Sequence, residues 1–323
     1  MNDQGPRTIA DLLGSAPLSN WGKWGPDDEV GSLNYLTPSE VLRGVASVVS
    51  GEVFTLQTPV GIPAEAGEPV WPDRSRAVRT QVVDESSFVR GDKETPSSGH
   101  HWADDKIEMF LQGSTQYDAL GHVWYDDQIW NGYSADTTIG GLSKASVLPI
   151  GQRGVAGRGV LIDMARHRGK AVLDRGEAFD HEDLLEAAAA QGVVVEKHDI
   201  LMIRTGWIGS YYSRTREDFY QDWTEPGLVY SRELVSWFKN LEIPNLVTDT
   251  MANERSRDPG TEIEIPLHSA LMRNLGIAMT ELCLLEDLAD ACAEDNRWTF
   301  LYTAAPLKVA GASGAPVNPV VIR

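Results

Sequence analysis

Short apolar runs that alternate with helical stretches constrain the fold of this chain more than any other feature. The apolar runs lie at residues 157–162, 200–204, 245–248 and 276–279. Each has the length of a strand and leads into polar or turn-forming residues. Helical patterns separate or follow these runs at about residues 180–191, 230–240 and 285–293. Strands and helices that interleave in this way predict an α/β or α+β fold.

The segments outside these runs extend the same pattern. A helix is predicted after Thr37, a residue suited to the N-cap, with Pro38 at the first helical position. Further strands are predicted at residues 52–60, 299–302 and 307–309. A tail that contains glycine and proline follows the last of these predicted strands.

The chain shows no sign of division into separate units. It has no internal repeat, no heptad array and no sharp change in composition. We therefore predict one domain across residues 1–323, with an N-terminal extension at residues 1–20. Residues 61–105 are polar and rich in turn formers, and loops longer than ~15 residues are usually functional or mobile. This segment is predicted to be a lid or a long arm that reaches another subunit.

Residues 112–122 concentrate polar side chains in one short stretch, QGSTQYDALGH. It follows the apolar run at residues 107–111, which predicts a strand. The polar positions are Gln112, Gln116, Asp118 and His122. Their even spacing would place them on one face of an extended chain, because side chains on a strand alternate. Such a set of oxygen and nitrogen donors is typical of a metal site, although a polar loop that caps a strand explains the spacing equally well.

Charge and composition argue against several classes of partner. The formal net charge is -19, and an acidic surface repels phosphate backbones, so we expect no nucleic-acid binding. No run reaches the roughly 18 apolar residues needed to span a bilayer, and the N-terminus does not resemble a signal peptide. The two cysteines, Cys283 and Cys292, are too few for a disulfide framework. We expect a soluble, cytoplasmic protein with buried thiols and no membrane partner.

Two of the seven histidines are the strongest candidates for chemistry. His122 and His268 both lie at predicted junctions of strand and loop, where functional residues accumulate. A structural histidine with satisfied hydrogen bonds fits these positions about as well. Glu281 follows His268 after a short helix and a returning strand. The motifs GxSxG, HExxH and GxxxxGK[ST] are absent, which argues against a serine hydrolase of the α/β-hydrolase type, a zincin and a P-loop enzyme.

Residues 112–122 resemble the HxGTHxDxPxH signature of the Putative cyclase family, which includes bacterial kynurenine formamidase and isatin hydrolase. Further blocks resemble the family in the same order along the chain. These blocks lie at residues 24–38, 201–207, 249–250, 268, 281, 305–307 and 314–319. The resemblance therefore covers nearly the whole chain from about Trp21 onward.

The resemblance implies a metal-dependent hydrolase that acts on an amide, lactam or lactone carbonyl of a small molecule. It also implies a swivelling β/β/α fold and assembly as a homodimer or homotetramer. Carried over by position, Asp118 and His122 match residues of the signature. His268 and Glu281 match the later histidine that shuttles protons and the later glutamate that completes the metal site.

The sequence departs from the family signature at four positions. Gln112 and Gln116 replace its first two histidines, Ser114 replaces a glycine and Leu120 replaces the proline. A carboxamide oxygen is a harder donor than an imidazole, and it suits manganese or magnesium better than zinc. We therefore expect one divalent ion, manganese or zinc with magnesium as a further option, in place of the two zinc ions of the formamidases.

Hydrolysis by metal-activated water is the leading hypothesis. The predicted metal ligands are Asp118, His122, Glu281, Gln116 and Gln112, the two glutamines serving as ligands or as hydrogen-bond partners of ligands. His268 is predicted to act with Glu281 in catalysis, first as general base and then as general acid, because its pKa lies near working pH. A competing hypothesis keeps the fold but removes the metal, which would leave a cyclase or a ligand-binding protein.

Large side chains in the neighbouring segments are predicted to line a pocket for a ring-bearing substrate. These predicted substrate-binding residues are Trp24, Asn34, Trp124, Tyr125 and Trp207. Ordinary core or interface packing explains the aromatic residues of this group as well.

Overall fold

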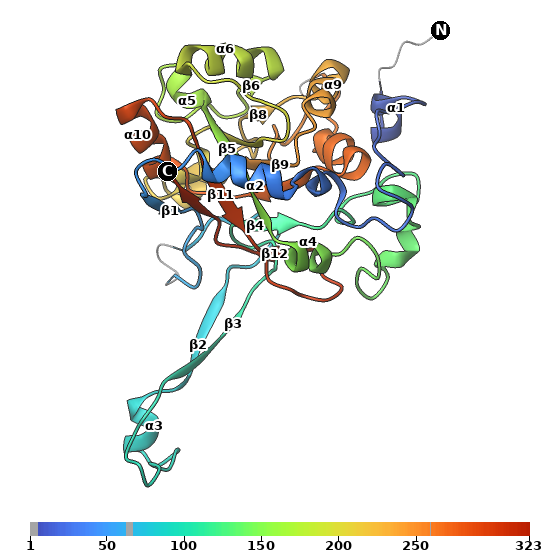
Figure 1. Cartoon of the computed structure of the whole chain (residues 1–323). Coiled ribbons are helices and arrows are strands. Elements are labelled where there is room, and N and C mark those ends of the chain that lie inside the picture. Colours follow the sequence, from blue (N-terminus) through green and yellow to red (C-terminus); the bar gives the residue numbers. More distant parts are fainter. Residues whose placement is uncertain (1–5, 63–66, 259) are drawn as a thin grey trace.

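The structure, a computed structural model, describes residues 6–62, 67–258 and 260–323. A mixed sheet of nine strands forms its centre, in the order β1-β13-β11-β5-β7-β9-β10-β4-β12 (Figure 1). The strands of this sheet are β1 Val53–Thr55, β4 Gln116–Asp118, β5 Val155–Asp163, β7 Ile200–Arg204, β9 Asn245–Thr248, β10 Ala278–Glu281, β11 Thr299–Ala304, β12 Gly314–Pro316 and β13 Val320–Ile322. Two small separate sheets pair β2 Val78–Val83 with β3 Asp104–Glu108 and β6 Ala178–Phe179 with β8 Gly227–Leu228.

Helices connect the strands and cover the sheet (Figure 1). The α-helices are α1 Ile9–Leu13, α2 Pro38–Val45, α3 Glu85–Val89, α4 Val147–Arg153, α5 Met164–His167, α6 His181–Gln191, α7 Trp207–Tyr211, α8 Arg216–Tyr220, α9 Arg232–Asn240 and α10 Glu286–Asp295. The short 3-10 segments are η1 Gly31–Tyr35, η2 Trp130–Gly132 and η3 Ala135–Thr138, and η4 His268–Asn274 is a π-helix. Helix α2 lies so close to β5 that a Cβ on Gly44 would meet the Gly157 carbonyl carbon at 2.6 Å.

The centre of the sheet is parallel and buried on both faces. Strands β5, β7, β9 and β10 run in the same direction. Val160 and Ile162 of β5 pack into the core that includes residues of α6 and α9, whereas Leu161 packs into the core that includes residues of α4 and α10. A strand covered on both faces needs apolar side chains at successive positions. The carboxyl ends of β7, β9 and β10 therefore meet at one edge of the sheet, where polar residues follow.

The fold class predicted from the sequence is confirmed, and its central elements are confirmed closely. The strands predicted at residues 200–204 and 245–248 coincide with β7 and β9. Helix α6 spans the predicted residues, and its N-cap Asp180 accepts hydrogen bonds from the backbone of the first turn. The strand predicted at residues 307–309 is wrong, since these residues form a loop. The tail supplies β12 and β13 instead, and β12 tolerates Pro316 because it is the edge strand.

The chain is not extended throughout residues 112–122, which is the condition under which their polar side chains would share one face. Only Gln116–Asp118 form a strand, because β4 is held between β10 and β12. The chain turns on either side, with hydrogen bonds from the Gly113 amide to the Phe110 carbonyl and from the His122 amide to the Ala119 carbonyl. The preceding strand lies earlier than predicted, at β3, and its side chains are exposed along its whole length.

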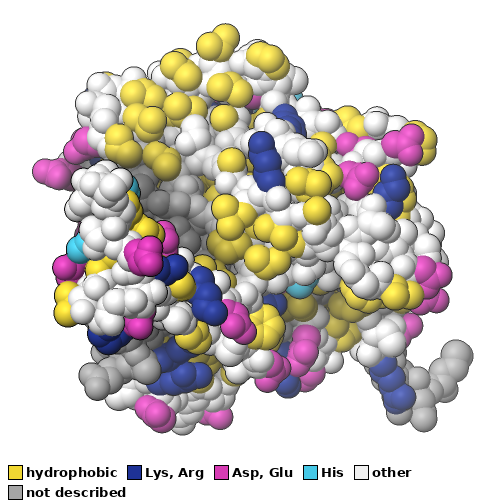
Figure 2. Space-filling view, turned by 90° about the horizontal axis from the view of Figure 1, so that it is seen from below, with side chains coloured by type: hydrophobic (Ala, Val, Ile, Leu, Met, Phe, Trp, Pro, Cys, Tyr) yellow, Lys and Arg dark blue, Asp and Glu magenta, His cyan; other side chains and the backbone are white. Residues whose placement is uncertain are grey.

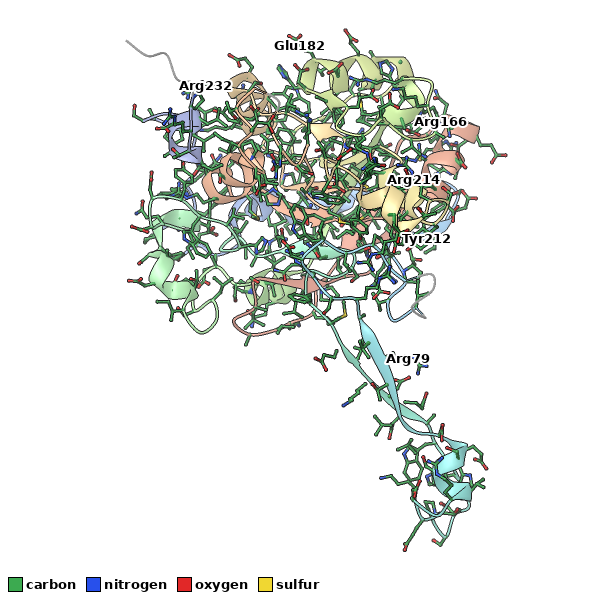
Figure 3. All side chains as sticks on the ribbon, turned by 180° about the vertical axis from the view of Figure 1, so that it is seen from behind. Arg79, Arg166, Glu182, Tyr212, Arg214 and Arg232 are labelled. Carbon is green, nitrogen blue, oxygen red and sulfur yellow. The ribbon has the colours of Figure 1, made fainter. Side chains whose placement is uncertain are left out.

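Residues 78–108 form an arm that projects away from the body (Figures 1 and 3). Strands β2 and β3 pair as an antiparallel ribbon, on which Arg79 forms an ion pair with Asp105 at 3.0 Å. At its tip, the rings of Phe88 and His101 stack with centroids 4.0 Å apart. The tip therefore has a small packed cluster of its own, although the ribbon below it is exposed.

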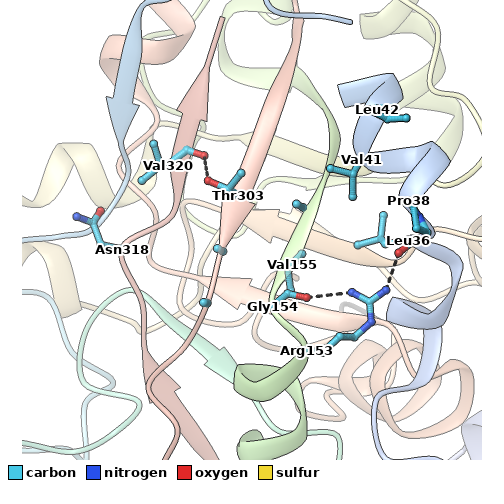
Figure 4. Close-up of a pocket in the computed structure, with 13 residues that line it drawn as sticks. Leu36, Pro38, Val41, Leu42, Arg153, Gly154, Val155, Thr303, Asn318 and Val320 are labelled. Carbon is cyan, nitrogen blue, oxygen red and sulfur yellow. Dashed lines mark hydrogen bonds between the residues drawn. The ribbon is translucent and has the colours of Figure 1, made fainter. Parts of the chain in front are cut away.

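The surface of the body mixes charges and contains an apolar hollow away from β4. Acidic and basic side chains are interspersed over the face in Figure 2. A hollow of about 1000 Å³ lies between α2, β5, β11 and β13, with Val41, Val155 and Val320 in its lining (Figure 4). Its one charged lining residue, Arg153, donates hydrogen bonds to the carbonyls of Leu36 and Gly154. Among the described residues, no helix has both the length and the apolar character needed to cross a bilayer.

Candidate metal centre

Strand β4 brings two predicted site residues to one face of the sheet. Gln116 lies opposite Glu281 in the antiparallel pairing of β4 with β10. Gln116 and Asp118 share a face because they are two residues apart, and Tyr117 between them points to the other side. There the Tyr117 hydroxyl donates to Asn245 and lies 3.2 Å from the Tyr302 hydroxyl. The apolar ring thus anchors the strand that presents the two polar side chains.

Asp118, His268 and Glu281 form a compact buried cluster. Each side chain offers a possible ligand atom, and these atoms all lie within 4.8 Å of one another. The Nε2 atom of His268 is 3.2 Å from Oε1 of Glu281 and 3.8 Å from Oδ2 of Asp118. All three residues are at most 3% exposed. The structure therefore unites residues that lie more than 160 positions apart in the sequence.

Glu254 holds His268 from the opposite side of its ring. Its Oε1 atom lies 2.7 Å from Nδ1 of His268 and accepts a hydrogen bond from the His268 backbone amide at 2.9 Å. Its other oxygen accepts from the Leu267 amide at 2.7 Å. These bonds fix the first turn of η4 and direct Nε2 of the histidine toward Asp118 and Glu281. The sequence analysis missed Glu254.

Two carboxamides bind the two oxygens of Glu281. Gln116 donates from Nε2 to Oε2 at 2.8 Å, and Asn253 donates from Nδ2 to Oε1 at 3.0 Å. Asn253 is a second residue that the sequence analysis missed. Its position in the loop that follows the buried strand β9 was the available signal, because ligands bind beyond the carboxyl ends of parallel strands.

His122 and Gln112 lie at the margin of this cluster. Nε2 of His122 is 3.9 Å from Oδ2 of Asp118, and its side chain is 23% exposed. Gln112 contacts Nδ1 of His122 at 3.5 Å but donates a shorter bond to Ser313 at 2.9 Å. Arg74, at the root of the arm, donates to the Gln112 carbonyl at 2.7 Å. The Gln112 side chain thus contacts His122 and Ser313, outside the three-residue cluster.

Burial and neighbouring charges shift the pKa values in the cluster. Burial, reinforced by the charge of Glu281, raises the pKa of Asp118 to about 6, although the two histidines oppose this shift. Burial lowers the pKa of His122, which favours its neutral form. Burial also acts to lower the pKa of His268, but the hydrogen bonds with Glu254 and Glu281 outweigh it and raise that pKa to about 10.

The donor set fits a divalent ion. Three buried carboxylates surround one imidazole, and buried negative charge without full compensation is unfavourable. The carboxamide oxygens Oε1 of Gln116 and Oδ1 of Asn253 are buried and have no hydrogen-bond partner. Orphaned acceptors of this kind are uncommon in folded proteins and point to a missing partner. Carboxylate and carboxamide oxygens with one imidazole suit manganese or magnesium.

Three of the predicted substrate-binding residues make contacts away from the cluster. Trp207 is fully buried, with the guanidinium of Arg214 5.1 Å from its ring centre. Trp24 packs edge-on against Tyr35. Asn34 donates hydrogen bonds within its own loop, to the Asp28 carboxylate at 2.6 Å and to the Gly31 carbonyl. None of these contacts involves a residue of the cluster.

The two remaining predicted substrate-binding residues lie beyond His122. Trp124 is 47% exposed. The Tyr125 ring carries the guanidinium of Arg273 3.8 Å from its centre, and its hydroxyl bonds to Asn274 on η4, the helix that begins at His268. Tyr125 is therefore linked to the cluster through η4, whereas Trp124 offers an exposed ring nearby in the sequence.

Comparison with known proteins supplies the family. Residues 55–255 match the family described as Putative cyclase. A crystal structure described as that of a novel cyclase has a TM-score of 0.85 and 34% identity, and the match covers 95% of this chain and 100% of that one.

Two solved structures of isatin hydrolase A are more distant. The enzyme from Labrenzia aggregata, bound to benzyl benzoate, has a TM-score of 0.57 and 18% identity over 90% of this chain and 98% of its own. The enzyme from Ralstonia solanacearum has a TM-score of 0.57 and 17% identity over 84% and 91%. At such identities the likeness shows the fold alone. No curated protein matches in sequence. With the family match and the 34% identical structure, the chain belongs to the Putative cyclase family.

Proposed function

We propose that this protein is a metal-dependent hydrolase that cleaves an amide, lactam or lactone bond of a small, ring-bearing substrate. The buried cluster of Asp118, His268 and Glu281 carries the proposal, because three side chains of ligand type converge there within 4.8 Å. The orphaned carboxamide oxygens beside it support the same reading. A divalent ion held by these residues lowers the pKa of a water molecule and polarises the substrate carbonyl.

The distances favour a division of roles between the two histidines that differs from the sequence hypothesis. His268 is nearly inaccessible, and Glu254 engages its Nδ1 while its Nε2 faces the two carboxylates. A histidine held in this way by a carboxylate is the usual form of a metal ligand. We therefore assign His268 to the ligand set, with Asp118 and Glu281, and Glu254 as the residue that orients it. Its raised pKa describes the protein without an ion, and ion binding at Nε2 would release the proton from that nitrogen.

His122 is then the general base and acid. It is more exposed than His268, and burial keeps its pKa low enough for the neutral, proton-accepting form. The His122 ring nitrogen that faces Asp118 takes a proton from the attacking water molecule. The carboxylate 3.9 Å away stabilises the imidazolium that results. The same nitrogen returns the proton to the leaving nitrogen or oxygen.

The substrate class rests on the chemistry of the site and on its relatives. Isatin, the substrate named for two of the similar structures, is a ring with a lactam bond. Tyr125 and the exposed Trp124 supply aromatic surface on the chain segment that follows His122. These features support a cyclic or aryl-bearing amide or ester.

Elemental analysis of protein purified without chelators, combined with a panel of aryl amides, lactams and lactones, tests the proposal. We expect about one divalent ion per chain, and loss of both the ion and hydrolysis in Asp118→Ala. Asp105→Ala on the exposed arm is a matched control that should keep both. Full activity in protein that contains no ion would refute the proposal.

A metal-free cyclase or ligand-binding protein is the second candidate, and one observation favours it. Gln116 and Asn253 already satisfy both oxygens of Glu281 without any ion. In that case the purified protein would contain no stoichiometric ion and would bind ring-bearing ligands equally well in the presence of a chelator.

A further inference from the structure

Glu225 is a buried carboxylate that the proposed mechanism does not use. It is fully buried, and both of its oxygens accept the Met251 amide, at 3.0 and 2.9 Å. Within the described part of the chain, no basic side chain forms an ion pair with it. Its carboxylate therefore serves one short stretch of backbone, the beginning of the loop at residues 251–254.

That loop delivers two residues to the candidate metal centre. Asn253 donates to Glu281, and Glu254 accepts from the ring and the backbone of His268. Two of the three residues of the cluster are thus oriented from this one loop. A shift of the loop would alter the positions of Glu281 and His268 together.

The loop needs such support because its conformation is strained. Asn253 has a φ of 54°, in the left-handed region that residues other than glycine seldom adopt. A buried residue persists in such a conformation only when the surrounding structure holds it there. The Glu225 carboxyl group accepts the Met251 amide, two residues before Asn253, where the chain enters this turn.

The segment that contains Glu225, residues 225–228, packs closely against the same loop and the residues that follow it. The Glu225 amide donates to the Ser256 hydroxyl at 3.2 Å, and the Arg255 amide donates to the Leu228 carbonyl at 2.9 Å. A Cβ on Gly227 would meet the Glu254 carbonyl carbon at 2.4 Å. Only glycine permits this approach. The residues around β8 therefore pack directly against the loop and support its backbone.

We propose that Glu225 is a positioning residue that fixes the loop at residues 251–254 and thereby sets the orientation of His268 and Glu281 for ion binding. The inference rests on the proposed function in one respect, since it takes these two residues to be ligands. A carboxyl group suits this task because its two oxygens can accept backbone N–H groups, as they do here from Met251.

Variants of the full chain test this role through ion affinity, measured by calorimetry with Mn²⁺ on chelator-stripped protein. In Glu225→Ala we expect affinity to fall roughly 10–100-fold, the usual effect of losing a residue that orients a ligand. Glu225→Gln keeps one acceptor oxygen and should restore part of the loss. Gly227→Ala, which forces the support away from Glu254, should weaken binding in the same direction even if Glu225→Ala does not fold.

A structural control separates positioning from general stability. Asp163, at the end of β5, is also buried, and its carboxylate accepts from the Arg166 amide and from Arg204. Asp163→Ala should therefore lower the denaturation midpoint but leave Mn²⁺ affinity within about twofold of the wild type, since its bonds do not lead to the loop. Equal losses of affinity in Asp163→Ala and Glu225→Ala would overturn the inference.

A second readout does not depend on any ion. The proton between His268 and Glu254 should give a resolved downfield NMR signal in the metal-free wild type, because a short bond to a carboxylate deshields it. We expect this signal to shift or broaden in Glu225→Ala and to persist in Asp163→Ala. An unchanged NMR signal with unchanged affinity overturns the role of Glu225. A wild type that binds no ion overturns the proposed function and the link to ion binding, and the NMR signal then tests by itself whether Glu225 positions His268.

Discussion

Two aspartates of this protein are buried to almost the same extent but differ in what surrounds them. Asp118 is 1% exposed and Asp249 is 0% exposed. Asp118 is the last residue of β4, and Asp249 directly follows β9 of the same sheet. Burial raises the pKa of both carboxyl groups, to about 6 for Asp118 and about 7 for Asp249. Exposure and pKa therefore do not distinguish them.

Their hydrogen bonds do distinguish them. Asp249 accepts the amide and hydroxyl of Thr205 at 2.8 and 2.7 Å and the amide of Gly206. Asp118 receives one long side-chain bond, from Gln116 at 3.4 Å, and otherwise faces the two histidines and Glu281. A satisfied carboxylate holds the fold together, whereas a carboxylate left among charged groups is available to a ligand.

Asp118→Asn gives the largest expected effect. We expect hydrolysis and ion affinity to fall by ~10³-fold or more, because the variant removes a charged ligand. Its stability should remain equal to that of the wild type or rise, since repulsion between Asp118 and Glu281 is removed. Calorimetry and urea denaturation measure the two quantities. A strong loss of stability would mean that Asp118 is structural, and the contrast with Asp249 would disappear.

Asp249→Ala should lower the stability of the protein and leave its ion affinity nearly unchanged. It leaves the buried amides of Thr205 and Gly206 without acceptors, and each such group costs about 1–3 kcal/mol. We expect the free energy of unfolding to fall by roughly 3 kcal/mol, while the ion affinity of the folded protein stays within a few-fold of the wild type. Asp249→Asn keeps one acceptor oxygen and should be milder. A loss of ion affinity as large as in Asp118→Asn would contradict this division.

The raised pKa of Asp249 should make the stability of the protein depend on pH. Its pKa is raised from 3.8 to about 7, so the folded protein holds a proton that the unfolded chain releases. The stability from this group is fully present below about pH 4 and is lost as the pH rises through about 7. Urea denaturation between pH 4 and 8 should show this decline in the wild type and a smaller decline in Asp249→Asn. Equal slopes in the two proteins would refute the shift.

Gln116→His probes the neighbour of Asp118 and carries the smallest expected effect. An imidazole is a softer donor than a carboxamide, so the ratio of zinc to manganese affinity should rise about tenfold. Competition between the two ions, followed by calorimetry, measures the ratio. An unchanged ratio would show that residue 116 is not a ligand and serves only as a hydrogen-bond donor to Glu281.

The central strands could be predicted because burial on both faces leaves little choice of residue. Residues 200–203, for example, are apolar throughout, and a buried strand is the element that fits a run of that length. The strands β12 and β13 could not be predicted, since they are short and lie among glycine and proline. Their pairing involves strands that are distant in the sequence, because β12 pairs with β4 and β13 pairs with β1 as well as with β11.

The candidate site could be predicted only in part. Asp118, His268 and Glu281 were identified through a resemblance that preserves their order along the chain. Glu254 and Glu225 carry no local pattern, and only the folded loop shows that one holds a histidine and the other holds the backbone. The role of His268 depended on distances, which no spacing encodes. The predicted assembly, the cytoplasmic location and the identity of the metal stay predictions.

The arm connects a distant surface of the protein to the candidate site. Its ribbon is anchored at the root, where Arg74, just before β2, binds the carbonyl of Gln112, just after β3. From this bond the ribbon extends away from the body to its tip (Figure 3). The Gln112 side chain contacts His122 and Ser313. A molecule bound at the packed tip would therefore be connected to His122 through one continuous pair of strands, although it would lie far from the site.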